Sequence, residues 1–240
     1  MLPKAIFFDM DDTILNDNRA SELAWQKACE ISTHKTGLFD SQELFKRINV
    51  IRKQYWSDPK RDLPGDEARL NYNFSRTVIA KTALIESGYF RDDNTAVEIV
   101  DNYAQLKLEC LELFPEAEKI LGILQKRGTL LALLTNGVAM EQRTKITRFG
   151  LDCYFPVCLI EGELGYGKPD QRFFKMALDK LGVMPNQAWM IGDDLERDIA
   201  GAQAAEIFSV WHDYGKAGLP EGSKIIPDRI INNLTELLTE

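Results

Sequence analysis

The fold is decided by one stretch near the start of the chain, Lys4-Ala5-Ile6-Phe7-Phe8-Asp9-Met10-Asp11-Asp12-Thr13. Its first half, Lys4–Phe8, is mostly apolar and lacks the alternation of a half-buried strand, which predicts a strand covered on both faces of a sheet. Its second half places several carboxylates directly after that strand. Because ligands bind outside the carboxyl ends of the strands in open parallel sheets, the stretch predicts a strand and a polar site together.

The rest of the chain supplies the partners that such a strand needs. Four more short apolar runs end in polar or glycine-containing turns: Leu130–Leu134, Phe155–Ile160, Ala188–Ile191 and Ile207–Trp211. From Pro115 onward, helical patterns alternate with these runs, at Glu116–Arg127, Val138–Phe149, Gln171–Leu181 and Leu195–Ala205. Such alternation predicts βαβ units and an α/β fold with a parallel sheet.

Residues 17–113 interrupt this rhythm. They contain no convincing strand, but they contain amphipathic stretches around Leu23 and Leu44 and over Arg69–Leu84 and Thr95–Leu111. Turns at 57–59 and 63–65 separate the second stretch from the third. The economical interpretation is an all-helical domain inserted after the first strand. We therefore expect two domains, a sheet domain of residues 1–16 and 114–240 and a helical domain of residues 17–113.

Composition limits the classes of function. The 240 residues carry 29 basic and 37 acidic side chains, and the net charge of −8 disfavours a nucleic-acid binder with a basic surface. The four cysteines form no C-x-x-C pair, so they predict neither a disulfide framework nor a zinc site and suit a reducing compartment. No apolar run approaches the roughly 18 residues of a membrane span. We expect a cytoplasmic protein with no membrane or nucleic-acid partner, and the oligomeric state stays open.

Carboxylates are expected to gather at the ends of two strands. Such groups repel one another unless a cation or a proton lies among them, and hard oxygen ligands suit Mg²⁺. A single aspartate at a strand end would more often cap a turn, but two acidic clusters after two strands favour a metal site. The aspartates expected at this edge of the sheet are Asp9, Asp11 and Asp193, with Asp12, Asp194 and Asp198 close by.

Two of these aspartates suggest a reaction. A carboxylate can attack phosphorus to give an aspartyl-phosphate, which divides one difficult hydrolysis into two steps. Asp9, at the tip of the strand, is placed for this attack. Asp11, two residues further on, could protonate the leaving alkoxide and then activate the water.

A second segment suggests a phosphate site. Leu134-Thr135-Asn136-Gly137 leaves a strand and opens a helix, so the Thr135 hydroxyl and free N–H groups of Asn136 and Gly137 could bind an anion. An ordinary helix cap with a turn glycine explains this segment alone equally well. Its place beside the acidic strand ends favours the anion site.

Lys168 could neutralise both the nucleophile and the transferring phosphoryl group, although a lone lysine is more often solvated. The run from Gly162 to Lys168 also fits the spacing of a P-loop, G-x-x-x-x-G-K. However, Pro169 stands where a P-loop needs Ser or Thr for Mg²⁺, and Glu161 and Glu163 would put negative charge beside the phosphates. A P-loop is therefore not expected.

With these residues in view, the chain resembles the haloacid dehalogenase superfamily, in its branch with a helical cap inserted after the first motif. Four motifs have counterparts in order, and the resemblance spans nearly the whole chain. They are Asp9-Met10-Asp11-Asp12-Thr13, Thr135-Asn136-Gly137, Lys168-Pro169, and Gly192-Asp193-Asp194 with Asp198. Within the family, Leu133 through Asp213 is most similar to the subgroup with N-acylneuraminate-9-phosphatase and pyrimidine nucleotidase-like phosphatases.

The resemblance implies a Rossmann-like three-layer core and an acyl-phosphate intermediate on Asp9. It implies Mg²⁺ held by the Asp9 side chain, the Asp11 backbone carbonyl and Asp193. It also implies that Thr135, Asn136 and Lys168 bind the phosphate and that Asp198 orients Lys168. Two positions depart from the commonest pattern, Asp12 where glycine is frequent and Asp194 where Ser or Thr is frequent, and a contact of Asp194 with the metal stays open.

The sequence therefore predicts a Mg²⁺-dependent phosphatase of a small phosphomonoester metabolite, either a sugar phosphate or a nucleoside monophosphate, with the cap domain selecting the substrate. A phosphomutase of the same family is the main alternative. A non-enzymatic phosphate-binding module is a weaker one, because a receiver domain would be shorter and would lack the helical insert. A haloacid dehalogenase is also disfavoured, because the resemblance implies that the true dehalogenases lack the second aspartate, Asp11.

Overall fold

The computed structural model describes residues 2–37, 39–56, 72–89 and 93–239. The chain divides into two compact units. The sheet unit consists of Met1–Asn16 and Leu113–Glu240, and the helical unit consists of Asp17–Glu112.

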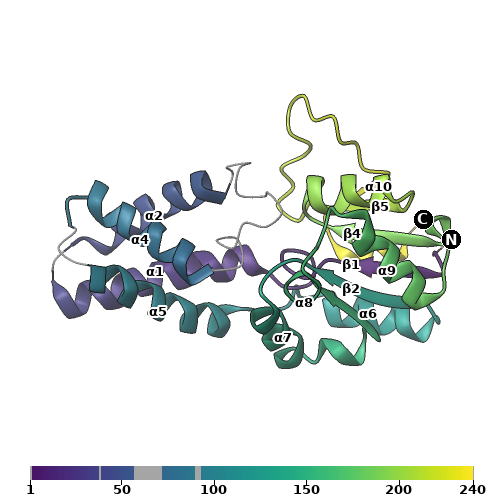
Figure 1. Ribbon diagram of the computed structural model, residues 1–240, viewed down its shortest axis with the longest axis horizontal. Helices are drawn as coiled ribbons and strands as arrows, with labels where there is room; N and C mark the ends of the chain where they lie inside the picture. The colour runs from purple at the N-terminus through teal and green to yellow at the C-terminus, as the bar shows by residue number, and fades with distance from the viewer. Residues whose placement is uncertain (1, 38, 57–71, 90–92, 240) are drawn as a thin grey trace. The chain divides into compact units, whose positions relative to one another are not determined.

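The sheet unit is built on one six-stranded sheet in which every neighbouring pair of strands is parallel (Figure 1). The strand order is β3-β2-β1-β4-β5-β6. The strands are β1 (Ala5–Phe8), β2 (Leu130–Thr135), β3 (Val157–Ile160), β4 (Ala188–Gly192), β5 (Phe208–His212) and β6 (Arg229–Ile231). Helices flank this sheet (Figure 1), so the predicted α/β fold with a parallel sheet is confirmed.

Strand β1 lies in the interior of the sheet, between β2 and β4. All four of its side chains are fully buried, which explains why its sequence is apolar without alternation. Ala5 and Phe7 share one apolar core with Phe173 and Phe174 of helix α9 (Gln171–Leu181). Successive side chains of a strand point to opposite faces, so Ile6 and Phe8 face the other layer.

Helix α9 shows how local sequence sets the edge of a layer. Asp170 caps its first turn by accepting a hydrogen bond from the Arg172 backbone N–H at 2.9 Å, and Gly182 ends the helix with a left-handed φ of 62°. The buried residues of α9 recur at helical spacing. They are Phe173, Phe174, Ala177 and Leu178. Burying each Phe side chain stabilises the fold by about 1.5–3 kcal/mol.

Three details differ from the sequence expectation. Strand β3 starts at Val157 instead of Phe155, because Pro156 has no backbone N–H to donate to a sheet. The short edge strand β6 was not predicted. The expected helix 195–205 begins as a π-helical segment, η4 (Leu195–Ala200), before α10 (Gly201–Ala204).

The remaining helical segments described in the sheet unit lie between strands along the chain, apart from the last one, η5, which follows β6. The longer ones are α6 (Ala117–Lys126) and α7 (Ala139–Arg148). The shorter ones are α8 (Glu161–Leu164), η2 (Leu151–Cys153), η3 (Pro185–Gln187) and η5 (Leu234–Leu238).

The helical unit has its own apolar core. Its described elements are α1 (Asp17–Thr36), α2 (Ser41–Trp56), α4 (Tyr72–Glu86) and α5 (Asp93–Cys110). Helices α1 and α5 pack together through Trp25 and Tyr103, whose rings stack with centroids 4.1 Å apart. The Tyr103 hydroxyl also donates to Ser21 Oγ at 3.2 Å. The turns predicted at 57–59 and 63–65 lie outside the described residues.

The two connections to the helical unit leave the sheet unit side by side. Leu15 and Leu113 form an antiparallel bridge, and the Phe114 N–H donates to the carbonyl oxygen of Ile14 at 2.9 Å. The two chain segments that flank the insert are therefore paired within the sheet unit itself.

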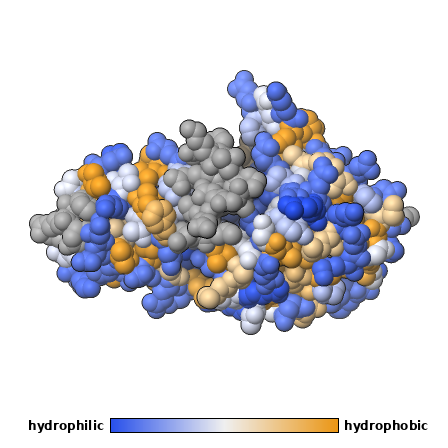
Figure 2. Space-filling view, in the orientation of Figure 1, coloured by the Kyte–Doolittle hydropathy of each residue, from blue (hydrophilic) through white to orange (hydrophobic). Residues whose placement is uncertain are grey.

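The visible surface is polar and mixed. Figure 2 shows hydrophilic side chains over much of the visible face, with apolar ones interspersed. Among the described helices, none is long and apolar enough to span a membrane.

Candidate active site

The predicted site residues come together because three neighbouring strands carry them. Asp9 follows β1, Thr135 ends β2 and Asp193 follows β4, and β1 lies between β2 and β4. The Asp9 backbone N–H donates to the carbonyl oxygen of Ile191 at 2.9 Å, which ties the tip of β1 to β4. Parallel strands thus bring Asp9 to the same edge as Thr135 and Asp193, which lie more than a hundred positions after it in the sequence.

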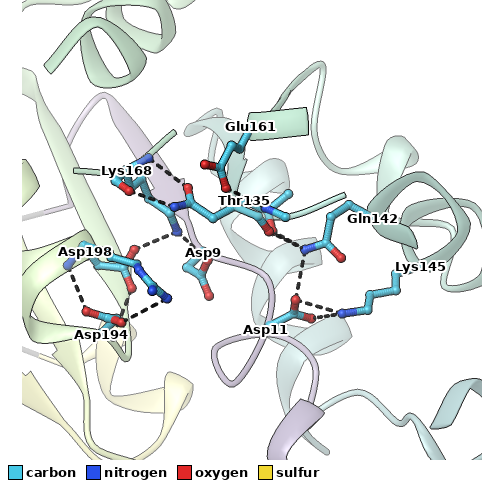
Figure 3. A network of polar contacts seen from close by, with 12 residues as sticks. Asp9, Asp11, Thr135, Gln142, Lys145, Glu161, Lys168, Asp194 and Asp198 are labelled. Carbon is cyan, nitrogen blue, oxygen red and sulfur yellow. Dashed lines mark hydrogen bonds and ion pairs between the residues drawn. The ribbon is translucent and has the colours of Figure 1, made fainter. Parts of the chain in front are cut away.

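Lys168 is a buried cation at this edge, in contact with Asp9 (Figure 3). Its ammonium forms an ion pair with Oδ1 of Asp9 and a second with Oδ1 of Asp198, the latter at 2.7 Å. The Lys168 and Asp198 side chains are only 2% and 1% exposed. The position of Asp198 therefore fits the orienting role that the resemblance implies for it.

The backbone of Lys168 is held by Asn136. The Asn136 side-chain Nδ2 donates to the Lys168 carbonyl at 2.7 Å, and the Lys168 N–H donates to Asn136 Oδ1 at 2.8 Å. A Cβ atom at Gly167 would lie 2.5 Å from Asn136 Oδ1, so only glycine permits this approach. A Cβ atom at Gly162 would lie 2.5 Å from the Ala139 backbone nitrogen. The two glycines of the P-loop-like spacing therefore serve close packing of loops.

Burial and crowding shift the ionisation of the acids. Burial raises the pKa of Asp9 to about 8, against the opposing effect of the Lys168 ammonium. Burial also raises the pKa of Asp193 well above its usual range, and the charges of Asp9 and Asp198 add to this shift. Burial raises the pKa of Asp198, although Lys168 lowers it. For Lys168, burial acts to lower the pKa, but Asp198 and Asp9 outweigh it and the net pKa is raised.

The donor set fits a divalent cation. Asp9, Asp193 and Asp198 each offer one carboxylate oxygen, and these oxygens lie within 4.8 Å of one another. Lys168 supplies one positive charge against these three carboxylates, so a hard cation would relieve the remaining repulsion. The part that the resemblance gives to Asp11, a ligand through its backbone carbonyl, stays a prediction.

The phosphate segment differs in one detail from the expectation. The Gly137 N–H, expected to be free, donates to Glu161 Oε2 at 3.0 Å. The Thr135 hydroxyl, at the end of β2, accepts a hydrogen bond from Gln142 Nε2 at 2.6 Å. The Thr135 hydroxyl donates only a longer bond, at 3.3 Å, to the Asn136 carbonyl oxygen, so it is the better-supported anion donor of the two.

Asp194 and Asp12 have structural explanations. Asp194 Oδ1 accepts from the backbone N–H groups of Glu196 and Arg197, at 2.9 and 2.8 Å, and so caps the π-helical segment η4. Asp12 has a φ of 59°, in the left-handed region, which gives a physical reason why glycine is frequent at this position.

Sequence reasoning missed two buried side chains of helix α7. Gln142 and Lys145 are 2% and 6% exposed, and both contact the Asp11 carboxylate. Their spacing of three places them on the same helix face, where an apolar pair would be expected. Polar residues on the inward face of an amphipathic helix are the signal that could have found them.

Fold and site together define an α/β enzyme built around a buried carboxylate–lysine centre. The chain belongs to the haloacid dehalogenase-like hydrolase family, whose sequence profile it matches over residues 3–206. The sequence resemblance to that family is therefore confirmed.

Similar proteins support the enzyme class. The chain is 46% identical to the phosphoserine phosphatase of Thermus thermophilus, with 98% of this chain and 97% of that protein covered. It is 27% identical to human N-acylneuraminate-9-phosphatase, with 98% and 92% covered. Both the family and these relatives confirm the predicted class, a phosphoric monoester hydrolase.

A solved structure supports the fold. The HAD-hydrolase YfnB from Bacillus subtilis, bound to magnesium, superposes with a TM-score of 0.76 at 23% identity. The match covers 99% of this chain and 97% of that one. Its sequence identity is low, so this likeness speaks for the fold alone.

Proposed function

We propose that this protein is a Mg²⁺-dependent phosphatase that hydrolyses a small phosphomonoester through an aspartyl-phosphate on Asp9. The observation that carries the proposal is the buried contact of Asp9 with Lys168, next to the carboxylates of Asp193 and Asp198. A carboxylate nucleophile, one ammonium for the phosphoryl charge and a donor set for a hard cation are the parts that such a reaction needs.

The residues divide the reaction into two steps. An Asp9 oxygen attacks phosphorus, the ester P–O bond breaks, and the leaving oxygen takes a proton from Asp11. A water molecule then attacks the acyl-phosphate while Asp11 takes a proton from it, which releases inorganic phosphate and restores Asp9. Lys168 and the Thr135 hydroxyl stabilise the phosphoryl oxygens throughout. Mg²⁺, held by Asp9 and Asp193, would neutralise charge on the phosphoryl group.

The names of two relatives support the proposed substrate class. The Thermus relative is named for phosphoserine and the human relative for a sugar acid phosphate. We propose phosphoserine as the first substrate to test, with sugar phosphates and nucleoside monophosphates beside it. We also propose that the helical unit selects among them, acting as the cap predicted over residues 17–113.

Phosphate release tests the proposal directly. Release from phosphoserine, a sugar phosphate panel, nucleoside monophosphates and an aryl phosphate would be measured with Mg²⁺ and with EDTA. We expect Mg²⁺-dependent release that Asp9→Asn abolishes and that Asp152→Asn leaves unchanged, because Asp152 is an exposed acid outside the site. Release that survives Asp9→Asn would refute the nucleophile, and release only with a bisphosphate activator would favour a phosphomutase.

A binding measurement supplies a readout besides activity. Mg²⁺ that binds the folded protein and not the unfolded chain stabilises it by RT ln(1 + c/Kd) at a free Mg²⁺ concentration c, so the melting temperature should rise with the Mg²⁺ concentration. We expect this shift to shrink in Asp193→Asn and to persist in Asp152→Asn. An equal shift in both variants would contradict the proposed cation site.

A further inference from the structure

Helix α7 holds the Asp11 carboxylate through two side chains (Figure 3). Lys145 Nζ donates to Oδ1 of Asp11 at 2.7 Å and to Oδ2 at 2.8 Å. Gln142 Nε2 donates to the same Oδ2 at 2.9 Å. These contacts join residues that are 131 and 134 positions apart, so they arise only in the folded sheet unit.

The surroundings fix the orientation of the Gln142 amide. Its nitrogen lies 2.9 Å from the Asn136 carbonyl oxygen and 2.6 Å from Thr135 Oγ1. A carbonyl oxygen and a carboxylate can only accept, so the amide nitrogen and not the amide oxygen must face them. The Thr135 oxygen accepts from Gln142, and the Thr135 hydroxyl itself donates to the Asn136 carbonyl oxygen at 3.3 Å, a long contact that a phosphoryl oxygen can displace.

The two carboxylate oxygens of Asp11 accept different numbers of these hydrogen bonds. In these contacts Oδ2 accepts hydrogen bonds from both Lys145 and Gln142, whereas Oδ1 accepts from Lys145. A carboxylate oxygen has two lone pairs, so these donors fill Oδ2 and leave one lone pair of Oδ1. The Lys145 side chain is 8% exposed and the Asp11 side chain 28% exposed, so the buried helix face constrains a carboxylate that solvent still reaches.

We propose that Gln142 and Lys145 are positioning residues that hold Oδ2 of Asp11 and so leave Oδ1 to transfer the proton. This inference rests on the proposed function. When the ester P–O bond breaks, the proton passes from Oδ1 to the leaving oxygen. When water attacks the acyl-phosphate, the water proton returns to Oδ1. Gln142 also donates to the Thr135 hydroxyl oxygen, so one amide contacts both the proposed acid–base group and the proposed phosphate site.

Leaving-group dependence separates this role from a general electrostatic one. An alkoxide leaves only with a proton, whereas an aryl oxide such as 4-nitrophenolate leaves readily without one. The ratio kcat/KM reports the steps up to release of the leaving group. We expect Lys145→Met and Gln142→Leu to lower kcat/KM for phosphoserine at least about 10-fold more than for 4-nitrophenyl phosphate. Lys145→Arg, which keeps the charge, should recover part of the loss.

Arg143→Met is the matched control on the same helix. Arg143 forms an ion pair with Glu163 at 2.6 Å and its side chain is 48% exposed, so the change removes a cation of α7 outside the Asp11 contacts. We expect its alkyl-to-aryl ratio of kcat/KM to equal that of the wild type. Equal losses for both substrate types in Lys145→Met and Gln142→Leu, or no loss, would overturn the inference.

Crystal structures supply an arm that does not depend on activity. In the wild type the Asp11 carboxylate should occupy one position, and in Lys145→Met it should turn away or occupy several. An Asp11 carboxylate unmoved in both Lys145→Met and Gln142→Leu would overturn the inference even if the kinetics changed. Absence of phosphate release from every substrate by the folded wild type would instead defeat the proposed function, and the crystal structures would still decide the positioning role.

Discussion

Replacing Gly192 with alanine should disable the site, although glycine carries no functional group. Gly192 ends β4, and the Asp198 side chain lies directly against its Cα. A Cβ atom at Gly192 would lie 2.2 Å from Oδ2 of Asp198 and 2.3 Å from its Cγ. Ordinary van der Waals contact begins at 3.4 Å, so Oδ2 must retreat by 3.4 − 2.2, or 1.2 Å.

A retreat of that size cannot leave the contacts of Asp198 intact. Asp198 holds Lys168 Nζ at 2.7 Å through Oδ1 and the Asp194 N–H at 3.1 Å through Oδ2. Overpacking of a close-packed site costs about 1–3 kcal/mol, and breaking a buried ion pair costs about 3–5 kcal/mol. We expect Gly192→Ala to lower the free energy of unfolding by about 1–3 kcal/mol, because relaxation of η4 spares part of the pair.

Urea unfolding and phosphate release together test this expectation. Activity should fall because Lys168 loses the partner that fixes it near Asp9. Gly122→Ala is the control: Gly122 lies within α6, a Cβ atom there would meet nothing within 4 Å, and alanine should stabilise by about 0.5–1 kcal/mol. A Gly192→Ala protein with wild-type stability and activity would refute the reasoning. The stability cost of Gly192→Ala should also be smaller in an Asp198→Gly background, because that background removes the clashing atoms. An equal cost in both backgrounds would refute the reasoning.

Three further predictions concern single residues. Asp12→Val should cost at least about 1 kcal/mol in urea unfolding, because a β-branched residue resists the left-handed φ of 59°, whereas Asp12→Gly should cost less. Burial lowers the pKa of His212, so below pH 6.5 the unfolded chain binds more protons than the folded one. The free energy of unfolding of the wild type should therefore fall as the pH is lowered below 6.5, by at most about 1.4 kcal/mol per pH unit more than that of His212→Gln. Stability–pH profiles of the two proteins that run parallel would contradict this. Burial raises the pKa of Cys29 to about 12 while Cys153 is exposed, so a disulfide reagent should label Cys153 in the native protein and Cys29 only on unfolding, as peptide mapping would show.

The fold was predictable because its strongest signals are local. Buried strands read as apolar runs, and the turns that follow them carry the polar residues, so five strands and their parallel arrangement could be inferred. The sixth strand, Arg229–Ile231, has three residues and a polar first position, and its sequence lacks the apolar run that identified the others. The π-helical segment at Leu195–Ala200 has no periodicity that distinguishes it from an α-helix over so few residues.

The site was predictable only where residues sit at strand ends. Asp9, Thr135 and Asp193 are found by that rule. Lys168 on its own is better explained as a solvated lysine, and the resemblance supplies the motif that favours it. Gln142 and Lys145 escape it because they lie within a helix, and their contact with Asp11 depends on how α7 packs. The Gly137 N–H donates to Glu161 Oε2, and no local sequence pattern predicts this hydrogen bond.

The paired connections at Leu15 and Leu113 make the insert a module. Since the sheet unit itself holds the two ends of the insert together, the length of the insert carries only the slow, logarithmic entropy cost of closing a loop. The chain between Leu15 and Leu113 can therefore lengthen, shorten or be exchanged while β1 and the carboxylate of Asp9 that follows it keep their positions in the sheet. Under the proposed function, chemistry and selectivity would lie in separate stretches of the sequence, and each could diversify without rebuilding the other.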